Sequence, residues 1–347
     1  MSKPIILVTG GTGYIGSHTA VELQQAGFEA VIIDNLSNST ADVVEGIRRI
    51  TGVRPHFEQA DCCCRNAVAA VFDRYPGITA VIHFAASKAV GESVEKPLLY
   101  YRNNLVSLLN VVEEMIAHGV FQIVFSSSCT VYGQPAVLPV TEDAPVQPAM
   151  SPYGNTKQIC EEILRDTAAS SALQGVLLRY FNPVGAHPSA EIGELPVGVP
   201  QNLVPFITQV AAGVRKELSV FGNDYHTPDG SCIRDYINVV DLARAHVQAV
   251  NYLLDGKNKT AMEAFNIGTG KGLSVLELIA AFQKATGIKL PYRITCRRAG
   301  DIEQVWANPG KAHTLLGWHA QESIEDTLRS AWKWELKVRR GEERGER

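Results

Sequence analysis

Tyr153 and Lys157 are the two residues whose types and spacing most directly suggest chemistry. They stand four positions apart and follow Pro152, which suits the first turn of a helix, so both side chains would share one helical face. A free phenol, with a pKa of about 10, is a poor base at neutral pH. A neighbouring cation favours the phenolate, so the pair predicts proton transfer with Tyr153 as the base.

Three consecutive serines, Ser126, Ser127 and Ser128, come at the end of a run expected to be a strand, residues 121–126. In a parallel α/β sheet this is the edge where ligands bind. The Ser128 hydroxyl could share the proton path with Tyr153 through a short hydrogen bond. We therefore expect Tyr153, Ser128 and Lys157 to form one catalytic group.

A glycine-rich turn near the N-terminus contains Gly10, Gly13, Tyr14, Ile15 and Gly16. It follows one expected strand and opens one expected helix, so its backbone can approach a pyrophosphate at the helix N-terminus. Asp34 ends the second expected strand, where a carboxylate can accept hydrogen bonds from both adenosine ribose hydroxyls and repels a 2′-phosphate. The turn and Asp34 predict NAD rather than NADP, and the nicotinamide ring adds a second cation beside Tyr153. Asp61 ends the third expected strand and is expected to meet the adenine, with an exposed loop carboxylate as the alternative.

Short runs rich in Val and Ile alternate with longer helical stretches in the first half of the chain. The expected strands are residues 4–9, 30–34, 54–60, 80–84, 121–126 and 176–180, and the expected helices are 14–26, 41–51, 66–74, 97–118 and 152–169. Strands without polar alternation are buried on both faces, as in parallel sheets covered by helices. The pattern predicts an α/β fold with a doubly wound parallel (Rossmann) sheet.

The rhythm changes after residue 180, where proline and glycine become frequent. The expected elements there are helices at 203–216, 239–254, 275–286 and 324–337 and a strand at 264–267. We predict an NAD-binding domain over 1–180 with a return segment near 239–260. A smaller mixed α/β substrate-binding lobe would cover 181–338, and 339–347 would be a frayed tail.

The composition is that of an ordinary globular protein. The 347 residues carry a formal net charge of −4, which argues against a surface built for nucleic acid or anionic membranes. No apolar run approaches the length of about 18 residues that a membrane span needs, so a cytoplasmic protein is expected.

Seven cysteines include the run Cys62, Cys63 and Cys64, which predicts partly buried thiols at the start of a helix, with metal or redox chemistry as the alternative. The histidines show no ligand spacing, and no metal is expected.

Four longer motifs, at residues 84–93, 125–133, 178–187 and 221–225, carry a family resemblance. With them, residues 5–334 resemble the nucleotide-sugar 4-epimerases of the extended short-chain dehydrogenase/reductase family. The resemblance implies tightly bound NAD, a homodimer and UDP-sugar substrates. It also implies interconversion of UDP-galactose and UDP-glucose through a 4-keto intermediate with transient reduction of NAD.

The resemblance implies two sets of binding residues. The NAD set comprises Gly10, Gly13, Tyr14, Ile15, Gly16, Asp34, Asn35, Asn38, Asp61, Phe84, Ala85, Lys88, Asn103, Tyr153, Lys157 and Tyr180. The nucleotide-sugar set comprises Ser128, Asn182, Asn202, Leu203, Phe221, Arg234, Tyr236, Arg298, Asp301 and Val305. The guanidinium groups of Arg234 and Arg298 suit a pyrophosphate, with a surface salt bridge as the alternative role of each.

Three alternatives to an epimerase of UDP-galactose and UDP-glucose share this scaffold: a 4,6-dehydratase, a catalytically silent NAD-binding protein and an epimerase of N-acetylated sugars. A 4,6-dehydratase needs an additional acid–base pair, but Ser128 is followed by Cys129, Thr130 and Val131, and the next carboxylate is Glu142. A catalytically silent NAD-binding protein is disfavoured by the intact catalytic group. Val305 stands where the narrow-specificity relatives often hold Tyr, so N-acetylated UDP-sugars are possible additional or even main substrates. The alternative is that Val305 only packs beside Trp306.

Overall fold

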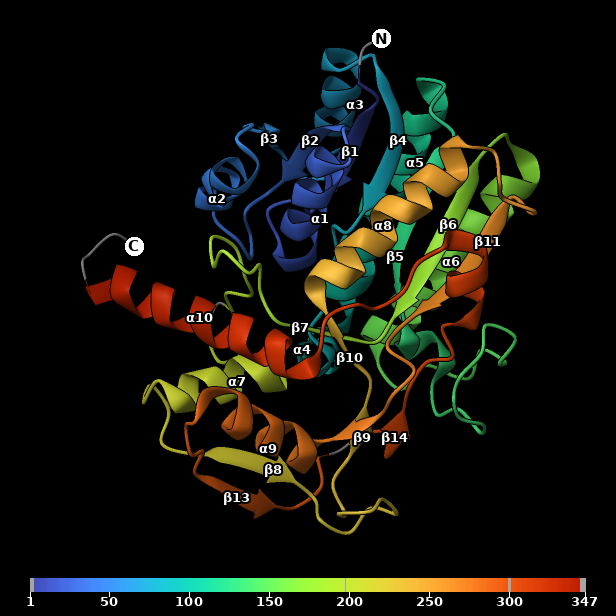
Figure 1. The fold of residues 1–347 in the computed structure, drawn as a ribbon. Coiled ribbons are helices and arrows are strands. Elements are labelled where there is room, and N and C mark those ends of the chain that lie inside the picture. Colours follow the sequence, from blue (N-terminus) through green and yellow to red (C-terminus); the bar gives the residue numbers. More distant parts are fainter. Residues whose placement is uncertain (1–2, 197, 299–300, 344–347) are drawn as a thin grey trace.

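A seven-stranded parallel sheet forms the centre of the computed structural model, which describes residues 3–196, 198–298 and 301–343 (Figure 1). The strands lie in the order β11-β6-β5-β4-β1-β2-β3. Their bounds are β1 Ile5–Thr9, β2 Glu29–Asp34, β3 His56–Gln59, β4 Ile78–His83, β5 Gln122–Ser128, β6 Gln174–Tyr180 and β11 Met262–Ile267. From β1 the chain adds β2 and β3 on one side of the sheet and then β4, β5 and β6 on the other. The order of the strands thus reverses between β1 and β4, which is where such sheets bind ligands. The predicted Rossmann fold is confirmed.

Helices cover both faces of this sheet, because successive strand residues point to opposite sides. Ile6 and Val8 pack with α1 and α8 on one face, whereas Leu7 packs with α3, α5 and α6 on the other. The helices around the sheet are α1 Tyr14–Gln25, α2 Asp42–Thr51, α3 Arg65–Arg74, α4 Val90–Glu95, α5 Pro97–Ala117, α6 Pro152–Ser170 and α8 Val239–Leu254. This sandwich leaves the carboxyl ends of β1, β4 and β5 to position a site.

A smaller lobe lies beside the carboxyl ends of the strands (Figure 1). It has its own apolar core, in which α7, α9 and α10 pack around Val220, Phe282 and Leu328. Its elements are β7 Asn182–Val184, α7 Leu203–Ala211, β8 Leu218–Phe221, β9 Ile233–Arg234, β10 Tyr236–Asn238, β12 Leu273–Ser274, α9 Val275–Thr286, β13 Tyr292–Thr295, β14 Gln304–Val305 and α10 Ile324–Glu343. The two lobes therefore have separate cores and meet at the edge of the main sheet.

Three expected elements differ from the structure. The helix expected over 203–216 ends at Ala211, because Gly213 turns the backbone into the left-handed region with φ +75°. The strand expected at 264–267 in the smaller lobe is β11 of the main sheet, paired with β6. Helix α10 continues to Glu343, into the segment expected to fray, and an ion pair between Arg339 and Glu335 supports the extension.

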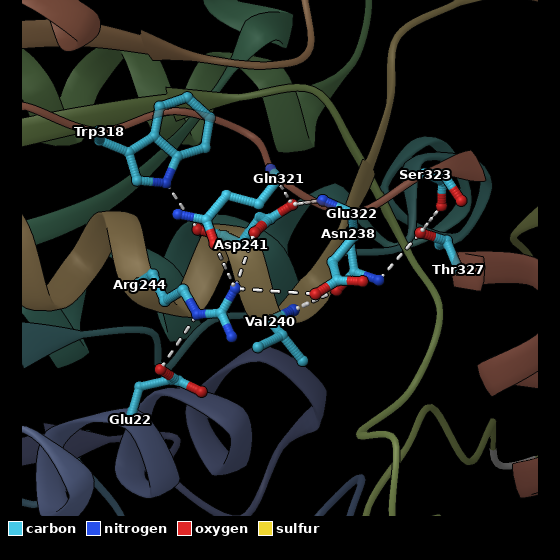
Figure 2. A network of polar contacts seen from close by, with 10 residues as sticks. All are labelled: Glu22, Asn238, Val240, Asp241, Arg244, Trp318, Gln321, Glu322, Ser323 and Thr327. Atoms are coloured by element: carbon cyan, nitrogen blue, oxygen red, sulfur yellow. Dashed lines mark hydrogen bonds and ion pairs between the residues drawn. The ribbon is translucent and has the colours of Figure 1, made fainter. Parts of the chain in front are cut away.

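A polar network centred on the buried Asp241 ties the return segment to both lobes (Figure 2). The Asp241 carboxylate on α8 accepts hydrogen bonds from the backbone N–H groups of Gln321 and Glu322, each at 2.9 Å. Arg244, one turn later, lies 3.2 Å from Asp241 and 3.4 Å from Glu22 on α1. The network holds α8 against α1 and holds the chain that leads into α10.

Candidate active site

The turn between β1 and α1 has the backbone shape that a pyrophosphate requires. Gly10 lies at φ +67°, in the region that favours glycine. A Cβ atom on Gly16 would lie 2.3 Å from the Gly10 carbonyl oxygen, so only glycine allows this close helix–strand packing. A Cβ on Gly13 would meet only that same oxygen within 4 Å. The open side of Gly13 leaves a cradle at the N-terminus of α1, which fits a dinucleotide phosphate.

The two acidic residues predicted for the adenosine half lie at the ends of β2 and β3. Asp34 accepts hydrogen bonds from the backbone N–H groups of Thr12 at 3.2 Å and Leu36 at 2.9 Å. Asp61 accepts from the Asn35 side chain at 3.1 Å and from the Cys63 backbone at 2.8 Å. The structure thus brings Asp34, Asn35 and Asp61 to one edge, with Asn38 exposed nearby in the sequence. This acidic edge next to the glycine turn suits ribose hydroxyls.

The three predicted catalytic residues are enclosed at the carboxyl end of β5. Tyr153 is 8% exposed, Ser128 6% and Lys157 3%. Burial and the nearby Tyr180 raise the pKa of the Tyr153 phenol, whereas a hydrogen bond from Ser128 lowers it. The residues of the chain alone therefore hold the phenol protonated, and a further cation is needed to make it a base at neutral pH. NAD fits this requirement, since its nicotinamide ring is cationic.

Lys157 is bound to the end of β5 as well as sharing helix α6 with Tyr153. Its Nζ atom donates to the Ser126 carbonyl oxygen at 2.6 Å and lies 4.8 Å from the Phe125 ring centroid. Burial lowers the pKa of Lys157 to about 8, and the nearby Cys160 and Glu161 oppose that shift. The ammonium group is thus anchored to β5, one helical turn from Tyr153.

The remaining predicted NAD residues lie at the carboxyl ends of strands or beside the chain that follows β4. Phe84 lies 4.6 Å from the His246 ring, and the Ala85 N–H donates to Thr9 Oγ1 at 3.2 Å. The Tyr180 hydroxyl lies 2.5 Å from Ser126 Oγ. Asn103 donates to Ser87 Oγ at 3.2 Å, which places it beside the chain that follows β4. Phe84, Ala85 and Tyr180 therefore stand at the ends of strands β4 and β6.

Glu194 connects the two predicted sets of binding residues, and the sequence analysis did not identify it. Its Oε1 atom lies 3.2 Å from Lys88 Nζ and accepts from Asn202 Nδ2 at 2.7 Å. Lys88 belongs to the predicted NAD set and Asn202 to the nucleotide-sugar set. Tyr14 also bridges the lobes, because its hydroxyl donates to the Gly185 carbonyl oxygen at 2.7 Å. Glu194 lies in an irregular segment, where no periodicity could have indicated its partners.

The predicted nucleotide-sugar residues come together from distant parts of the chain. Arg234 on β9 pairs in register with Val305 on β14. Arg298 Nη2 donates to Asp301 Oδ1 at 2.6 Å, and Arg234 lies 3.8 Å from the same oxygen. The Arg298 guanidinium lies 5.7 Å from the Phe221 ring centroid. Two guanidinium groups around one carboxylate leave a net positive site, which fits a pyrophosphate.

The other predicted sugar residues lie on β7, β10, α7 and β14, or directly before α7. Asn182 on β7 pairs with Tyr236 on β10, and Tyr236 is buried. Leu203 opens α7, directly after Asn202. Val305 is 4% exposed and packs in a cluster with Tyr132 and Phe181.

The consecutive cysteines have different environments. Cys62 packs in the core between the sheet and α3, whereas Cys64 is exposed and precedes the first residue of α3. Burial raises the pKa of Cys63 to about 11, so its thiol stays protonated at neutral pH. Among the described residues, no three His, Cys, Asp or Glu side chains are grouped to hold a metal ion. None of the helices in the described part of the chain is long and apolar enough to cross a membrane.

The chain matches one family model and close relatives over nearly its whole length. The family described as GDP-mannose 4,6 dehydratase matches residues 7–331. A UDP-glucose 4-epimerase of Bacillus subtilis is 53% identical over 331 residues, which cover 95% of this chain and 96% of that protein.

Two solved structures share the fold and the arrangement of both lobes. The UDP-glucose-4-epimerase of Stenotrophomonas maltophila, with bound NAD and formylated UDP-arabinopyranose, is 50% identical with a TM-score of 0.94. The similarity covers 97% of this chain and 99% of that one. The UDP-glucose 4-epimerase of Bifidobacterium longum, in complex with NAD+ and UDP, is 45% identical with a TM-score of 0.93 and the same coverage.

Proposed function

The chain belongs to the family described as GDP-mannose 4,6 dehydratase, and within it we propose that the protein is an NAD-dependent UDP-glucose 4-epimerase. The observation that carries this proposal is the enclosed group of Tyr153, Ser128 and Lys157 beside a glycine turn built for a dinucleotide. Relatives that are about half identical over the full length and carry this activity support it.

The residues of the chain divide the reaction between them. When bound, NAD supplies a nicotinamide ring that accepts a hydride from carbon 4 of the sugar and returns it. Tyr153 removes the proton of the 4-hydroxyl group and, after the 4-keto sugar has turned to present its other face, returns it to the oxygen on carbon 4. Ser128 donates a hydrogen bond to the phenolate, and Lys157 supplies positive charge on the same helix. Arg234 and Arg298 hold the nucleotide, so the sugar can turn without escaping.

The site favours epimerisation over 4,6-dehydration, despite the description of the family. Elimination of water needs an additional acid–base pair close to the catalytic tyrosine. The positions after Ser128 are Cys129, Thr130 and Val131. Glu142, the next carboxylate along the chain, accepts a hydrogen bond from the backbone of Asn266 at 2.7 Å. It is thereby bound to strand β11.

A second activity, on UDP-N-acetylglucosamine and UDP-N-acetylgalactosamine, is favoured by Val305. Valine lacks the ring that fills space beside carbon 2 of the sugar in narrow-specificity relatives. Val305 pairs with Arg234, which brings it next to a residue proposed to hold the nucleotide. The proposal is therefore a UDP-glucose 4-epimerase that also accepts N-acetylated sugars.

We further propose a homodimer formed through the end of α4 and the start of α5. Val94, Leu98 and Leu99 are 62%, 80% and 50% exposed, a concentration of apolar surface that a second copy would cover. Light scattering at several protein concentrations should give twice the mass of one chain, and Leu98→Glu should reduce it. A monomer at all concentrations contradicts this proposal. The cytoplasmic location and the absence of nucleic-acid binding stay predictions.

The activity is tested with purified protein and no added cofactor. We expect UDP-galactose to be converted to UDP-glucose, with absorbance of reduced nicotinamide appearing during turnover, and UDP-N-acetylglucosamine to be converted separately. A 4-keto-6-deoxy sugar nucleotide as the product would identify a 4,6-dehydratase instead. Bound NAD without any sugar conversion would identify a catalytically silent protein.

A further inference from the structure

A buried ion pair lies directly behind the catalytic group. Glu161 on α6 and Arg179 on β6 are almost fully enclosed, at 2% and 3% exposed. Arg179 Nε donates to Glu161 Oε1 at 2.9 Å, and Arg179 Nη2 donates to Oε2 at 2.6 Å. Enclosing two charges costs desolvation that often cancels their attraction, so such a pair is weak evidence of a purely stabilising role. A role in positioning nearby groups is the alternative.

The pair is bonded to the strand that carries the catalytic serine. Ser127 Oγ donates to Glu161 Oε1 at 2.6 Å. One residue earlier on β5, the Ser126 carbonyl oxygen accepts from Lys157 Nζ at 2.6 Å. Helix α6 therefore holds β5 at two successive residues, through two side chains that are one helical turn apart. The next residue of the strand is Ser128.

The same carboxylate is the charged neighbour that favours the ammonium form of Lys157. From α6, Lys157 faces Cys160 and Glu161, and both oppose the effect of burial on its pKa. From β4 it faces His83, whose pKa burial lowers to about 3, so that this imidazole is neutral. From β5 it faces the Phe125 ring and the Ser126 carbonyl oxygen. Glu161 is itself faced by Arg179 and, at 2.9 Å, by Arg165.

Building on the proposed function, we propose that Glu161 is a positioning residue for the proton transfer. Its carboxylate holds the Ser126–Ser128 end of β5 against α6, so that Ser128 and Lys157 keep their places beside Tyr153. Its charge keeps Lys157 in the ammonium form that the reaction requires.

Two substitutions distinguish the effect of the Glu161 charge from the effect of its side-chain length. Glu161→Gln removes the charge, so the pKa of Lys157 should fall. The loss of activity on the alkaline side should therefore begin at a lower pH than in the parent protein. We expect the alkaline limb of the kcat profile to move down by about one pH unit, with KM for UDP-galactose unchanged. Glu161→Asp keeps the charge but shortens the side chain by one methylene group. It should lower kcat several-fold and leave the alkaline limb where it is.

The matched control is Glu162→Gln, on the exposed side of the same helix, which should leave kcat, KM and the pH profile unchanged. Each variant is assayed as the NAD-loaded protein, with its NAD content and thermal unfolding midpoint measured. An unshifted alkaline limb in folded, NAD-loaded Glu161→Gln overturns the inference while the proposed function stands. A parent protein without epimerase activity overturns the proposed function and this inference together.

Glu161→Gln leaves the Arg179 guanidinium buried without a counter-charge, which can prevent folding. In that case Glu161→Gln combined with Arg179→Gln removes both charges, and a smaller downward shift of the alkaline limb is expected, because the pair removed has no net charge. Ser127→Ala is the mildest test, because it removes only the bond to β5. A several-fold loss of kcat at unchanged KM and NAD content supports the inference, and an unchanged kcat contradicts it.

Discussion

At the scale of single residues, the buried phenol of Tyr153 decides whether a proton can leave the sugar. Tyr153→Phe removes only the hydroxyl oxygen and should lower kcat by about 10²–10⁴-fold. NAD should stay bound, because the glycine turn and Asp34 are unchanged. Turnover of UDP-galactose and the NAD content of the purified variant measure both effects.

Tyr101→Phe is the matched control for this prediction. The Tyr101 hydroxyl on α5 accepts a hydrogen bond from the Asn155 side chain at 2.7 Å, and neither residue belongs to the proposed catalytic group. Tyr101→Phe should leave the turnover of UDP-galactose nearly unchanged. Epimerisation by Tyr153→Phe at close to the parent rate would refute the assignment of Tyr153 as the base.

Val305 is the residue on which the substrate range is predicted to depend. Val305→Tyr should suppress turnover of UDP-N-acetylglucosamine and largely preserve that of UDP-galactose, compared as kcat/KM. Because Val305 is buried against Tyr132 and Phe181, the larger ring should also cost about 1–3 kcal/mol of stability. The thermal unfolding midpoint of the variant therefore accompanies the assay. Equal loss of both activities would contradict the role in specificity.

At the scale of elements, the first helix depends on its close approach to the turn before it. Gly16→Ala places a Cβ atom 2.3 Å from the Gly10 carbonyl oxygen and 2.8 Å from Gly11 Cα, and backbone atoms cannot yield cheaply. Helix α1 must shift away, so we expect a loss of roughly 1–3 kcal/mol and a strongly reduced NAD content. Thermal unfolding and cofactor extraction measure the two effects.

Gly91→Ala is the control within a helix that has room. A Cβ atom there meets only the end of the Gln201 side chain, at 4.0 Å. Alanine should stabilise α4 by up to about 1 kcal/mol and leave the NAD content unchanged. Equal loss of NAD in both variants would show that NAD binding does not depend on the close packing of Gly16 against Gly10.

At the scale of the whole molecule, three buried histidines make the fold sensitive to acid. Burial lowers the pKa of His18 and His83 to about 3 and that of His246 to about 4. The unfolded chain takes up protons on these residues near pH 6.5, whereas the folded chain does not, so protonation favours unfolding below pH 6.5. Each histidine should cost about 1.4 kcal/mol per pH unit, and the unfolding midpoint should fall steeply between pH 6.5 and 5.

Two variants test the cause of this acid sensitivity. His246→Gln should make the fall of the midpoint shallower, because one buried titrating group is removed. His56→Gln replaces a histidine whose side chain is about half exposed and should leave the slope unchanged. A midpoint that is level between pH 6.5 and 5 in the parent protein would contradict the prediction.

Local patterns predicted much of the fold and part of the site. The helices α8 and α9 begin and end where the periodicity predicts, at Val239–Leu254 and Val275–Thr286. The glycine turn and the carboxylate of Asp34 depend on one strand–turn–helix unit and the strand after it. Their geometry is set by contacts between near neighbours, which leave a recognisable spacing in the chain.

The amino-acid sequence by itself determined the parallel sheet, the glycine turn and the helical pairing of Tyr153 with Lys157, because each follows from the period of one element. Only the tertiary structure decided that β11 joins the main sheet, that Glu194 links Lys88 to Asn202, and that Glu161 lies between Ser127 and Arg179. Such contacts join separate elements, and their geometry depends on how the whole chain packs. No spacing along the chain records that packing.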